Sequence, residues 1–256
     1  MRALDPEVFD AVWGAVEPLL PARPEVEHPL GCHRRRVSDR LCFKAIVIRL
    51  VTGCSWVDAE RFIDQAVSDT TLRARRDEWE RAGVFSALVE EALSAYDRVI
   101  GLDLSETAVD GSQHKAPMGG EADRGKLGWK WSLLTDRAGI PIGWTTNGAN
   151  RHDLILFDDT LEDAGGRGLL ADIETLHLDR GYDCRAVRDS CSAHGLTDVI
   201  CAKQRSRGGA PKAVKLAKIT VPLGDRRIAH RLAQLALAIV FLITAKLIDW
   251  RNRWSR

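Results

Sequence analysis

The stretches Thr107-Ala-Val-Asp110-Gly-Ser112 and Leu176-His-Leu-Asp179-Arg-Gly-Tyr182 decide the fold of this 256-residue chain. In each, an aspartate directly follows a short apolar strand. A carboxylate at a strand end lies at the rim of a sheet, where it can reach a metal ion, and two on neighbouring strands can share one. Two-metal phosphoryl-transfer sites usually need a third acid. No glutamate follows Glu174, so that acid is hard to find in this chain.

The part of the chain after residue 100 alternates strand and helix patterns. The predicted order is strand 106–110, strands 127–134 and 140–145 joined by a tight turn at 136–139, helix 152–163, strand 174–179, helix 184–194, strand 198–202, basic loop 203–218 and helix 228–250. An antiparallel hairpin followed by helix and strand units predicts an α/β fold, in which helices cover both faces of a mixed sheet.

The first 100 residues are predicted to be helical. Asp5-Pro6-Glu7 is typical of a helix start. A second helix is expected from Ser38 to Thr52, a third from Ser55 to about Ala66, and a fourth after Ser68. Helix, glycine-containing turn and helix form the outline of a helix-turn-helix. In that interpretation Arg73, Arg75 and Arg76 contact DNA; in the alternative they face water on a small helical bundle.

Charge is distributed unevenly along the chain. From Lys203 to Arg256 there are 13 Lys and Arg residues against Asp225 and Asp249, a net charge of +11, which leaves −10 on residues 1–202. A basic tail beside an acidic body indicates nucleic acid as a partner, with a solvated helical surface as the alternative. The hydrophobic content of 45% suits a globular protein.

Two other site classes are weakly indicated. The six cysteines form no CxxC pair and no signal peptide precedes them, so we expect free thiols in a reducing cytosol. The spacing of Cys184, Cys191, His194 and Cys201 matches no zinc-ligand pattern. The apolar run 232–248 is at the short limit for a membrane span and is interrupted by Gln234 and Lys246, so we expect a helix buried against a sheet and no membrane.

Four motifs carry a resemblance to a known family. They are Asp110-Gly-Ser-Gln-His-Lys-Ala-Pro117, Asp123-Arg-Gly-Lys-Leu-Gly-Trp-Lys-Trp-Ser132, Gly148-Ala-Asn-Arg-His-Asp153 and Leu178-Asp-Arg-Gly-Tyr-Asp183. Together they resemble motifs of the DDE transposases of small bacterial insertion sequences. The turn Gly53-Cys-Ser-Trp56 and the closing segment 249–254 also look like that family, so the resemblance covers nearly the whole chain. It implies a ribonuclease-H-like core over 101–256, preceded by a helical region over 1–100.

The resemblance also implies a chemistry and a set of roles. Water and then a freed 3′-hydroxyl attack DNA phosphodiesters in line, helped by two Mg²⁺ ions about 3.5–4 Å apart, with Mn²⁺ as a substitute. Asp110 and Asp179 would be metal ligands. The implied partners are the element ends and target DNA, bound by a homo-oligomer in the bacterial cytoplasm at the nucleoid. Some residues are expected to contact DNA because they stand in the family-like motifs, and others because they are basic. They are His114, Lys115, Lys126, Lys130, Arg180, Lys212, Lys215 and Lys218.

One departure from the family pattern concerns the third acid. In the family it is a glutamate on the helix after the last core strand, whereas here Val221-Pro-Leu-Gly224 runs directly into Asp225-Arg-Arg-Ile-Ala-His230. An in-frame deletion would explain this junction, and the loop 118–122 also looks shortened. Asp225 is the only nearby substitute and is one methylene shorter than glutamate. We therefore expect a defective transposase; the alternatives are a DNA-binding inhibitor without chemistry and a ribonuclease-H-like nuclease with a host function.

Overall fold

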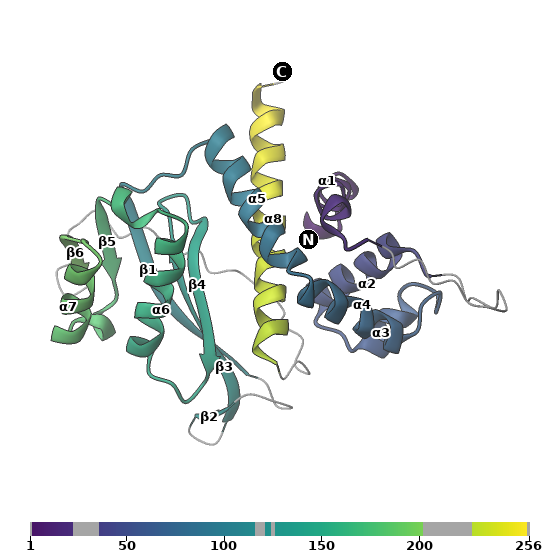
Figure 1. Ribbon diagram of the computed structural model, residues 1–256, viewed down its shortest axis with the longest axis horizontal. Helices are drawn as coiled ribbons and strands as arrows, with labels where there is room; N and C mark the ends of the chain where they lie inside the picture. The colour runs from purple at the N-terminus through teal and green to yellow at the C-terminus, as the bar shows by residue number, and fades with distance from the viewer. Residues whose placement is uncertain (1, 23–35, 116–120, 124–125, 202–226, 255–256) are drawn as a thin grey trace. The chain divides into compact units, whose positions relative to one another are not determined.

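The computed structural model describes residues 2–22, 36–115, 121–123, 126–201 and 227–254 (Figure 1). These residues form two compact units. Of the described residues, one unit holds 2–22, 36–92 and 233–254, and the other holds 93–115, 121–123, 126–201 and 227–232. The boundary falls within a helix near residue 92, and most of the last helix groups with the amino-terminal unit. The division into domains at residue 100 stays a prediction.

The first unit is helical. Its elements are η1 (Arg2–Leu4), α1 (Pro6–Val16), η2 (Glu17–Leu19), α2 (Asp39–Thr52), α3 (Trp56–Arg61), α4 (Asp69–Arg81), the first part of α5 (Val84–Val99) and most of α8 (Ile228–Trp254). Phe43 of α2 lies at the centre of its core. The Phe43 ring is 5.6 Å from that of Trp13, 6.4 Å from that of Trp79 and 6.5 Å from that of Phe241. Helices distant in sequence therefore share one aromatic core.

The predicted helix starts of this unit are present. Asp5, Ser55 and Ser68 accept hydrogen bonds from backbone N–H groups in the first turns of α1, α3 and α4. The expected end of the third helix at Ala66 is wrong, because α3 ends at Arg61. The backbone at Asp64 and Gln65 has φ of 54° and 57°, which a right-handed helix cannot contain.

The second unit is built on a mixed sheet. Its strands are β1 (Glu106–Lys115), β2 (Glu121–Asp123), β3 (Lys126–Thr135), β4 (Pro141–Gly148), β5 (Thr175–Leu178) and β6 (Asp198–Cys201). The strand order is β2-β3-β1-β5-β6, and β4 also pairs with β3. β1, β3 and β4 are antiparallel neighbours, whereas β1, β5 and β6 run parallel. Apart from the short β2, the order β4-β3-β1-β5-β6 is the ribonuclease-H-like arrangement that the sequence predicted.

Four further helical segments belong to this unit: α6 (Asp153–Gly166), η3 (Leu170–Asp172), η4 (Arg180–Tyr182) and α7 (Arg185–Ala193). α6 packs closely on β4 (Figure 1). A Cβ added at Gly143 would lie only 2.7 Å from the carbonyl oxygen of Thr160 and 2.9 Å from the Cβ of Ala164. Glycine at this position therefore sets how near α6 can come to the sheet.

Strand boundaries differ from the prediction at β1 and β2. β1 continues past Asp110 to Lys115, so His114 and Lys115 belong to a strand and not to a loop. Residues 108–115 pair antiparallel with β3, which explains the extension. β2 pairs with the start of β3 in a region that showed no strand pattern.

Among the described residues, α8 is the one helix that is long and apolar enough to cross a membrane, judged by length and composition alone. Ile239 and Ile243 of α8 are fully buried, and Phe241 stacks on Phe43 within the helical unit. The helix is buried as the apolar pattern predicted, but residues 233–254 group with the helices of the first unit and not with the sheet.

Candidate functional site

The parallel register of β1 and β5 brings the two aspartates together. Val109 pairs with Leu178 as the last Cα partners of the two strands, and Asp110 and Asp179 are the next residues. Neighbouring strands lie about 4.8 Å apart. Asp110 and Asp179 are both exposed, although the strands that lead to them are buried. The two carboxylates that the sequence singled out thus leave the sheet side by side.

Asp179 is oriented by the turn that follows it. Its Oδ1 accepts a hydrogen bond of 2.7 Å from the backbone N–H of Gly181 and caps η4. A Cβ at Gly181 would lie 3.0 Å from the same oxygen, so a side chain there would crowd it. This bond uses one carboxylate oxygen of Asp179, and a capping role is therefore compatible with a metal-binding role.

The electrostatic environment of Asp110 is unfavourable for its charge. The Asp110 side chain reaches solvent, but the protein around its carboxyl displaces part of the water, and this partial desolvation raises its pKa. The carboxylates of Asp179 and Asp153 raise the pKa further, while the backbone N–H of Gly111 lowers it. Negative charge is therefore concentrated around Asp110 beyond what the local groups neutralise. A bound cation would remove this penalty.

Asp153, at the start of α6, is a further acid whose charge acts on the Asp110 carboxyl. The cap of α6 is His152, whose Nδ1 accepts from the backbone N–H of Leu154 at 3.4 Å. Asp153 instead lies 3.1 Å from the ammonium group of Lys130 on β3, which also donates to the carbonyl oxygen of Arg151 at 2.9 Å. The only sequence signal was the position of Asp153 in a family-like motif, and that motif assigns no contact.

His114 lies on the same face of β1 as Asp110, because residues 110, 112 and 114 alternate with those that point the other way. Its Nε2 is 3.3 Å from the hydroxyl oxygen of Ser112, and its ring meets Trp131 edge-on. Burial lowers the pKa of His114, and the buried Arg231 guanidinium lowers it further. At neutral pH the ring is uncharged, so it can contact a phosphate only as a neutral hydrogen-bond donor.

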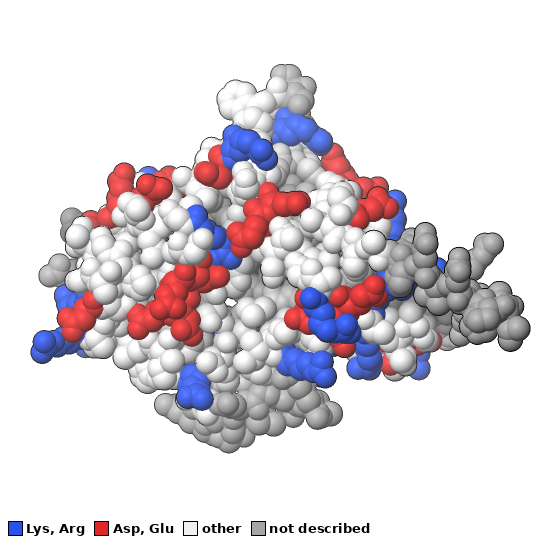
Figure 2. Space-filling model, viewed as in Figure 1, with Lys and Arg blue, Asp and Glu red and all other residues white. Residues whose placement is uncertain are grey.

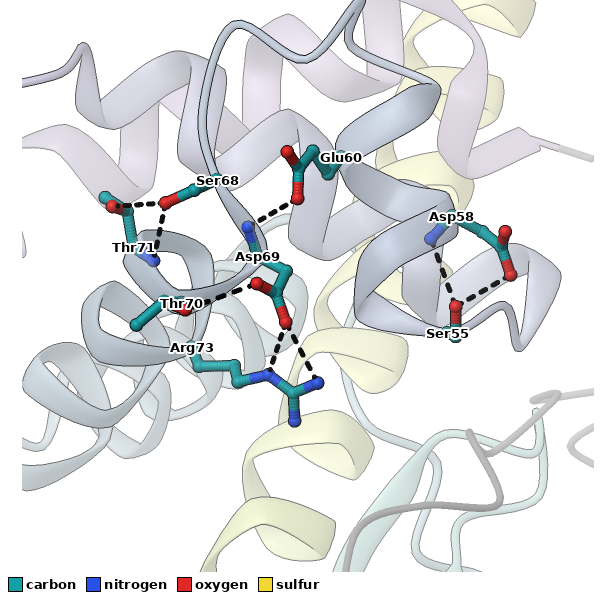
Figure 3. A network of polar contacts seen from close by, with 8 residues as sticks. All are labelled: Ser55, Asp58, Glu60, Ser68, Asp69, Thr70, Thr71 and Arg73. Carbon is teal, nitrogen blue, oxygen red and sulfur yellow. Dashed lines mark hydrogen bonds and ion pairs between the residues drawn. The ribbon is translucent and has the colours of Figure 1, made fainter.

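The three arginines of α4 have different surroundings. Arg73 is exposed and pairs with Asp69, within the polar network that joins α3 to α4 (Figure 3). Arg75 is only 6% exposed and pairs with the buried Asp39, and Arg76 is 8% exposed and pairs with Asp77. The alternative in which Arg75 and Arg76 face water is therefore wrong for both side chains. Their contact with DNA stays a prediction, and burial disfavours it. Arg73 alone is available at this surface.

Arg73 also makes a cation–π contact with the Trp56 ring. Its guanidinium lies 5.8 Å from the ring centroid, and the guanidinium groups of Arg49 and Arg76 lie 4.4 Å and 5.1 Å from the same ring. Cation–π contacts of this kind restrict the arginine side chains. The network in Figure 3 adds a bond from the backbone N–H of Asp69 to Glu60, which ties the start of α4 to α3.

The remaining residues that were predicted to contact DNA have different surroundings. Arg180 is exposed directly after Asp179, whereas Lys130 is largely covered and engaged by Asp153. Lys115 and Lys126 lie on β1 and β3. Asp225, the proposed substitute acid, and Lys212, Lys215 and Lys218 lie outside the described residues. Figure 2 shows acidic side chains over α6 on the visible face, where Asp158, Asp159 and Glu162 are exposed.

The carboxylates of Asp110 and Asp179 supply some, but not all, of the ligands that a divalent cation needs. Carboxylate oxygens are the ligands that Mg²⁺ prefers, and the raised pKa of Asp110 indicates negative charge that a cation would neutralise. Within the described ranges, no three His, Cys, Asp or Glu side chains are arranged as a ready-made metal site. Two adjacent carboxylates therefore fit the cation, and the part of the chain that the structure describes supplies no third ligand in place.

The strand order and the paired aspartates define a ribonuclease-H-like protein. Residues 8–89 match the family model "Putative transposase of IS4/5 family (DUF4096)". The chain is 34% identical over 143 residues to the insertion element IS402 uncharacterized 16.2 kDa protein of Burkholderia cepacia, an alignment that covers 56% of this chain and 90% of the relative. The chain belongs to this IS4/5 transposase family.

Solved structures of the Mos1 transposase are more distantly similar. A paired-end complex with the left transposon end is 13% identical with a TM-score of 0.28, and the match covers 75% of this chain and 62% of that one. A Mos1 mariner paired-end complex with Mn is 14% identical with a TM-score of 0.31, over 90% of this chain and 83% of that one. The fold assignment rests on the strand order and not on these alignments.

Proposed function

We propose that this chain binds the DNA of an insertion element and carries the remains of a metal-dependent site for end cleavage and strand transfer. The observation that carries the proposal is the register of β1 and β5, which ends at Val109 and Leu178 and places Asp110 beside Asp179. Membership of a transposase family supports DNA as the substrate. A fold alone does not set a function, so the paired carboxylates are the essential part of the argument.

In this proposal the side chains divide the work between cation and DNA. Asp110 and Asp179 hold Mg²⁺ or Mn²⁺ through their carboxylate oxygens. When bound, such ions activate the attacking oxygen and stabilise the leaving oxygen of an in-line displacement at phosphorus. Arg180 follows Asp179 directly and is exposed, so it is suited to hold the DNA strand near the two acids. Arg73 of α4 and the basic segment with Lys212, Lys215 and Lys218 neutralise backbone phosphates elsewhere.

We further propose that the chain is catalytically defective. The family-like sequence around its third acid is interrupted between Gly224 and Asp225, as an in-frame deletion would leave it. Asp225 is one methylene shorter than the expected glutamate. Loss of a charge-neutralising group at a phosphoryl-transfer site removes most activity, because these reactions depend on electrostatic stabilisation of the phosphate.

The test is Mg²⁺-dependent cleavage of a labelled DNA end of the parent element, with the chain as it stands and with a version in which the missing stretch is restored. We expect cleavage only by the restored version. Cleavage by the unaltered chain, with loss of that activity in Asp225→Ala, would contradict the defect and assign the third position to Asp225.

A second candidate function is DNA binding without chemistry. It is favoured by the lack of a preformed three-ligand set among the residues that the structure describes. A chain of this kind would occupy element ends or join an oligomer of intact transposase and so inhibit it. Specific binding of the labelled end, with no cleavage by either version of the chain, is the result that supports this candidate over the first.

A further inference from the structure

Asp69, the first residue of α4, is held in place by several bonds (Figure 3). Its backbone N–H donates to Oε2 of Glu60 on α3 at 2.8 Å, and its Oδ1 accepts from the hydroxyl of Thr70 at 3.2 Å. Its other carboxylate oxygen, Oδ2, lies 3.2 Å from both Nε and Nη2 of Arg73. Residues four apart on a helix are neighbours on its surface. The first turn of α4 therefore carries a carboxylate that fixes the direction of the Arg73 guanidinium.

The Arg73 side chain is half exposed, yet its guanidinium is oriented from two sides. Asp69 engages the edge that carries Nε and Nη2, and the Arg73 Cζ lies 5.8 Å from the ring of the buried Trp56. A guanidinium has five N–H groups in a fixed fork. Figure 3 shows the remaining nitrogen, Nη1, pointing away from Asp69. The outer edge of the guanidinium, formed by Nη1 and Nη2, therefore keeps N–H groups that Asp69 does not use.

The exposed residues in the first two turns of α4 are Thr70, Arg73 and Ala74. They lie on one face of the helix, because residues three and four apart share a face. Leu72 and Trp79 form the opposite, fully buried face. The small side chains beside Arg73 allow another surface to approach α4 closely. In a helix-turn-helix, the N-terminal residues of the second helix contact base edges in the major groove, and α4 follows α3 in that position.

Charge favours a base edge over a phosphate as the partner of Arg73. Asp69 and Arg73 together carry no net charge, so a phosphate that approaches the guanidinium also meets the Asp69 carboxylate. The O6 and N7 atoms of guanine are two neutral acceptors that match the outer edge of an arginine. Asp69 can therefore hold the guanidinium in the direction that this contact needs without repelling the partner.

We propose that α4 is a recognition helix and that Arg73 donates to O6 and N7 of one guanine in the major groove of the element's DNA, with Asp69 as the residue that positions it. The inference replaces the phosphate contact given to Arg73 above with a contact to one base. It rests on the proposed function only in that the chain binds DNA, and it needs neither the metal site nor catalysis.

The experiment selects duplexes from a random-sequence pool with the full chain, and then replaces each G·C pair of the selected site in turn by A·T. One replacement should weaken binding of the unaltered chain by about 5- to 150-fold. In Arg73→Met, which keeps the stem of the side chain and loses the fork, that preference should disappear while those at other positions remain. Arg61→Met is the matched control, because Arg61 is an exposed arginine of α3 that pairs with Asp58. It should keep the preference.

Asp69→Asn tests the positioning role, because asparagine keeps the shape of the side chain without its charge. The preference at the same base pair should fall, while affinity for other duplexes should not fall, since a negative charge has left the surface that faces DNA. A merely structural role would weaken binding to all duplexes alike. Asp58→Asn is the control, because it removes the same charge from the Asp58–Arg61 pair and should leave the preference intact.

Three results would overturn this inference and leave DNA binding by the chain standing. They are the absence of any G·C preference in the unaltered chain, an unchanged preference in Arg73→Met, and equal weakening of all duplexes in Arg73→Met. In the last case a salt dependence that is shallower by about 0.9 in log–log slope would assign Arg73 to a phosphate. No binding of any duplex by the unaltered chain would overturn the proposed function itself. Thermal unfolding checks that each variant is folded.

Discussion

At the residue scale, Asp110 is held at a cost to the stability of the fold. Its pKa is raised above the ordinary value of 3.8, first by partial desolvation and then by Asp179 and Asp153. A group whose pKa is raised on folding stabilises the protein below its unfolded pKa, and this contribution is lost as the pH rises through the folded pKa. At neutral pH without a cation, the charged Asp110 therefore opposes folding.

Asp110→Asn should make the chain more stable at pH 7 in the presence of a chelator. The midpoint of thermal unfolding is expected to rise by about one to a few degrees, because an amide carries no charge to repel Asp179. The difference from the unaltered chain should shrink as the pH falls through the raised pKa of Asp110, because the carboxyl then takes up a proton. Calorimetry at several pH values measures this. A variant that is less stable at pH 7 would show that the charge of Asp110 is well accommodated.

The arginines of α4 provide a second residue-scale prediction. Arg75→Met leaves the buried Asp39 with less compensation, and loss of one partner of a buried pair costs about 3–5 kcal/mol. Arg73→Met removes an exposed pair with Asp69 and should cost under about 1 kcal/mol. Denaturant titration measures both. DNA binding should weaken in Arg73→Met at unchanged fold; equal stability losses in the two variants would contradict this division of roles.

The sequence alone could predict Asp110 and Asp179 because each stands in a motif after an apolar strand. It could not separate Arg73 from Arg75 and Arg76, because burial of a charge depends on partners such as Asp39 that come from a different helix. The same limit applies to Asp153. Its neighbours Lys130 and Gly111 lie on two other strands, and no local pattern records their contact with it.

At the element scale, contact between α6 and β4 depends on Gly143. Gly143→Ala would place a methyl group 2.7 Å from the Thr160 carbonyl oxygen, so helix and strand must separate. Overpacking of this kind costs about 1–3 kcal/mol. Gly14→Ala is the matched control, because a Cβ on Gly14 meets nothing within 4 Å on α1. It should stabilise the chain by about 0.5–1 kcal/mol, since alanine favours a helix. Denaturant unfolding measures both, and a neutral Gly143→Ala would contradict the close packing.

Elements with strong periodicity or clear caps were predictable. The hairpin of β3 and β4 and the helix α6 follow alternation, turn and capping signals within the sequence. The end of α3 and the extent of β1 were not predictable, because the local sequence pattern does not determine them. α3 stops where Asp64 and Gln65 adopt left-handed φ angles, and β1 continues because β3 offers it a partner.

At the scale of the whole molecule, DNA affinity should be controlled by the basic carboxy-terminal part of the chain. Each phosphate contact contributes a slope of about −0.9 to the dependence of log affinity on log salt concentration. Replacing Lys212, Lys215 and Lys218 together with Gln should therefore make that slope less steep by about 2–3 units. Binding to a labelled duplex at several salt concentrations measures it. An unchanged slope would remove these lysines from the DNA interface.

The whole-molecule assignment was predictable from the order of elements, because strand, hairpin, helix and strand in this sequence have few ways to pair. The reaction centre was less predictable. The register of β1 and β5 places the two proposed metal ligands side by side. The third position rests on Asp225, which lies outside the described residues, and on the proposed deletion before it.

The most direct test of the account is a double-mutant cycle on Mn²⁺ affinity with Asp110→Asn, Asp179→Asn and the combined variant. If both aspartates bind the same cation, each single change should weaken binding by about 100-fold or more, and the combined variant should lose much less than the sum of the two free-energy losses. Independent, additive losses, or full affinity in either single variant, would show that Asp110 and Asp179 do not form one site.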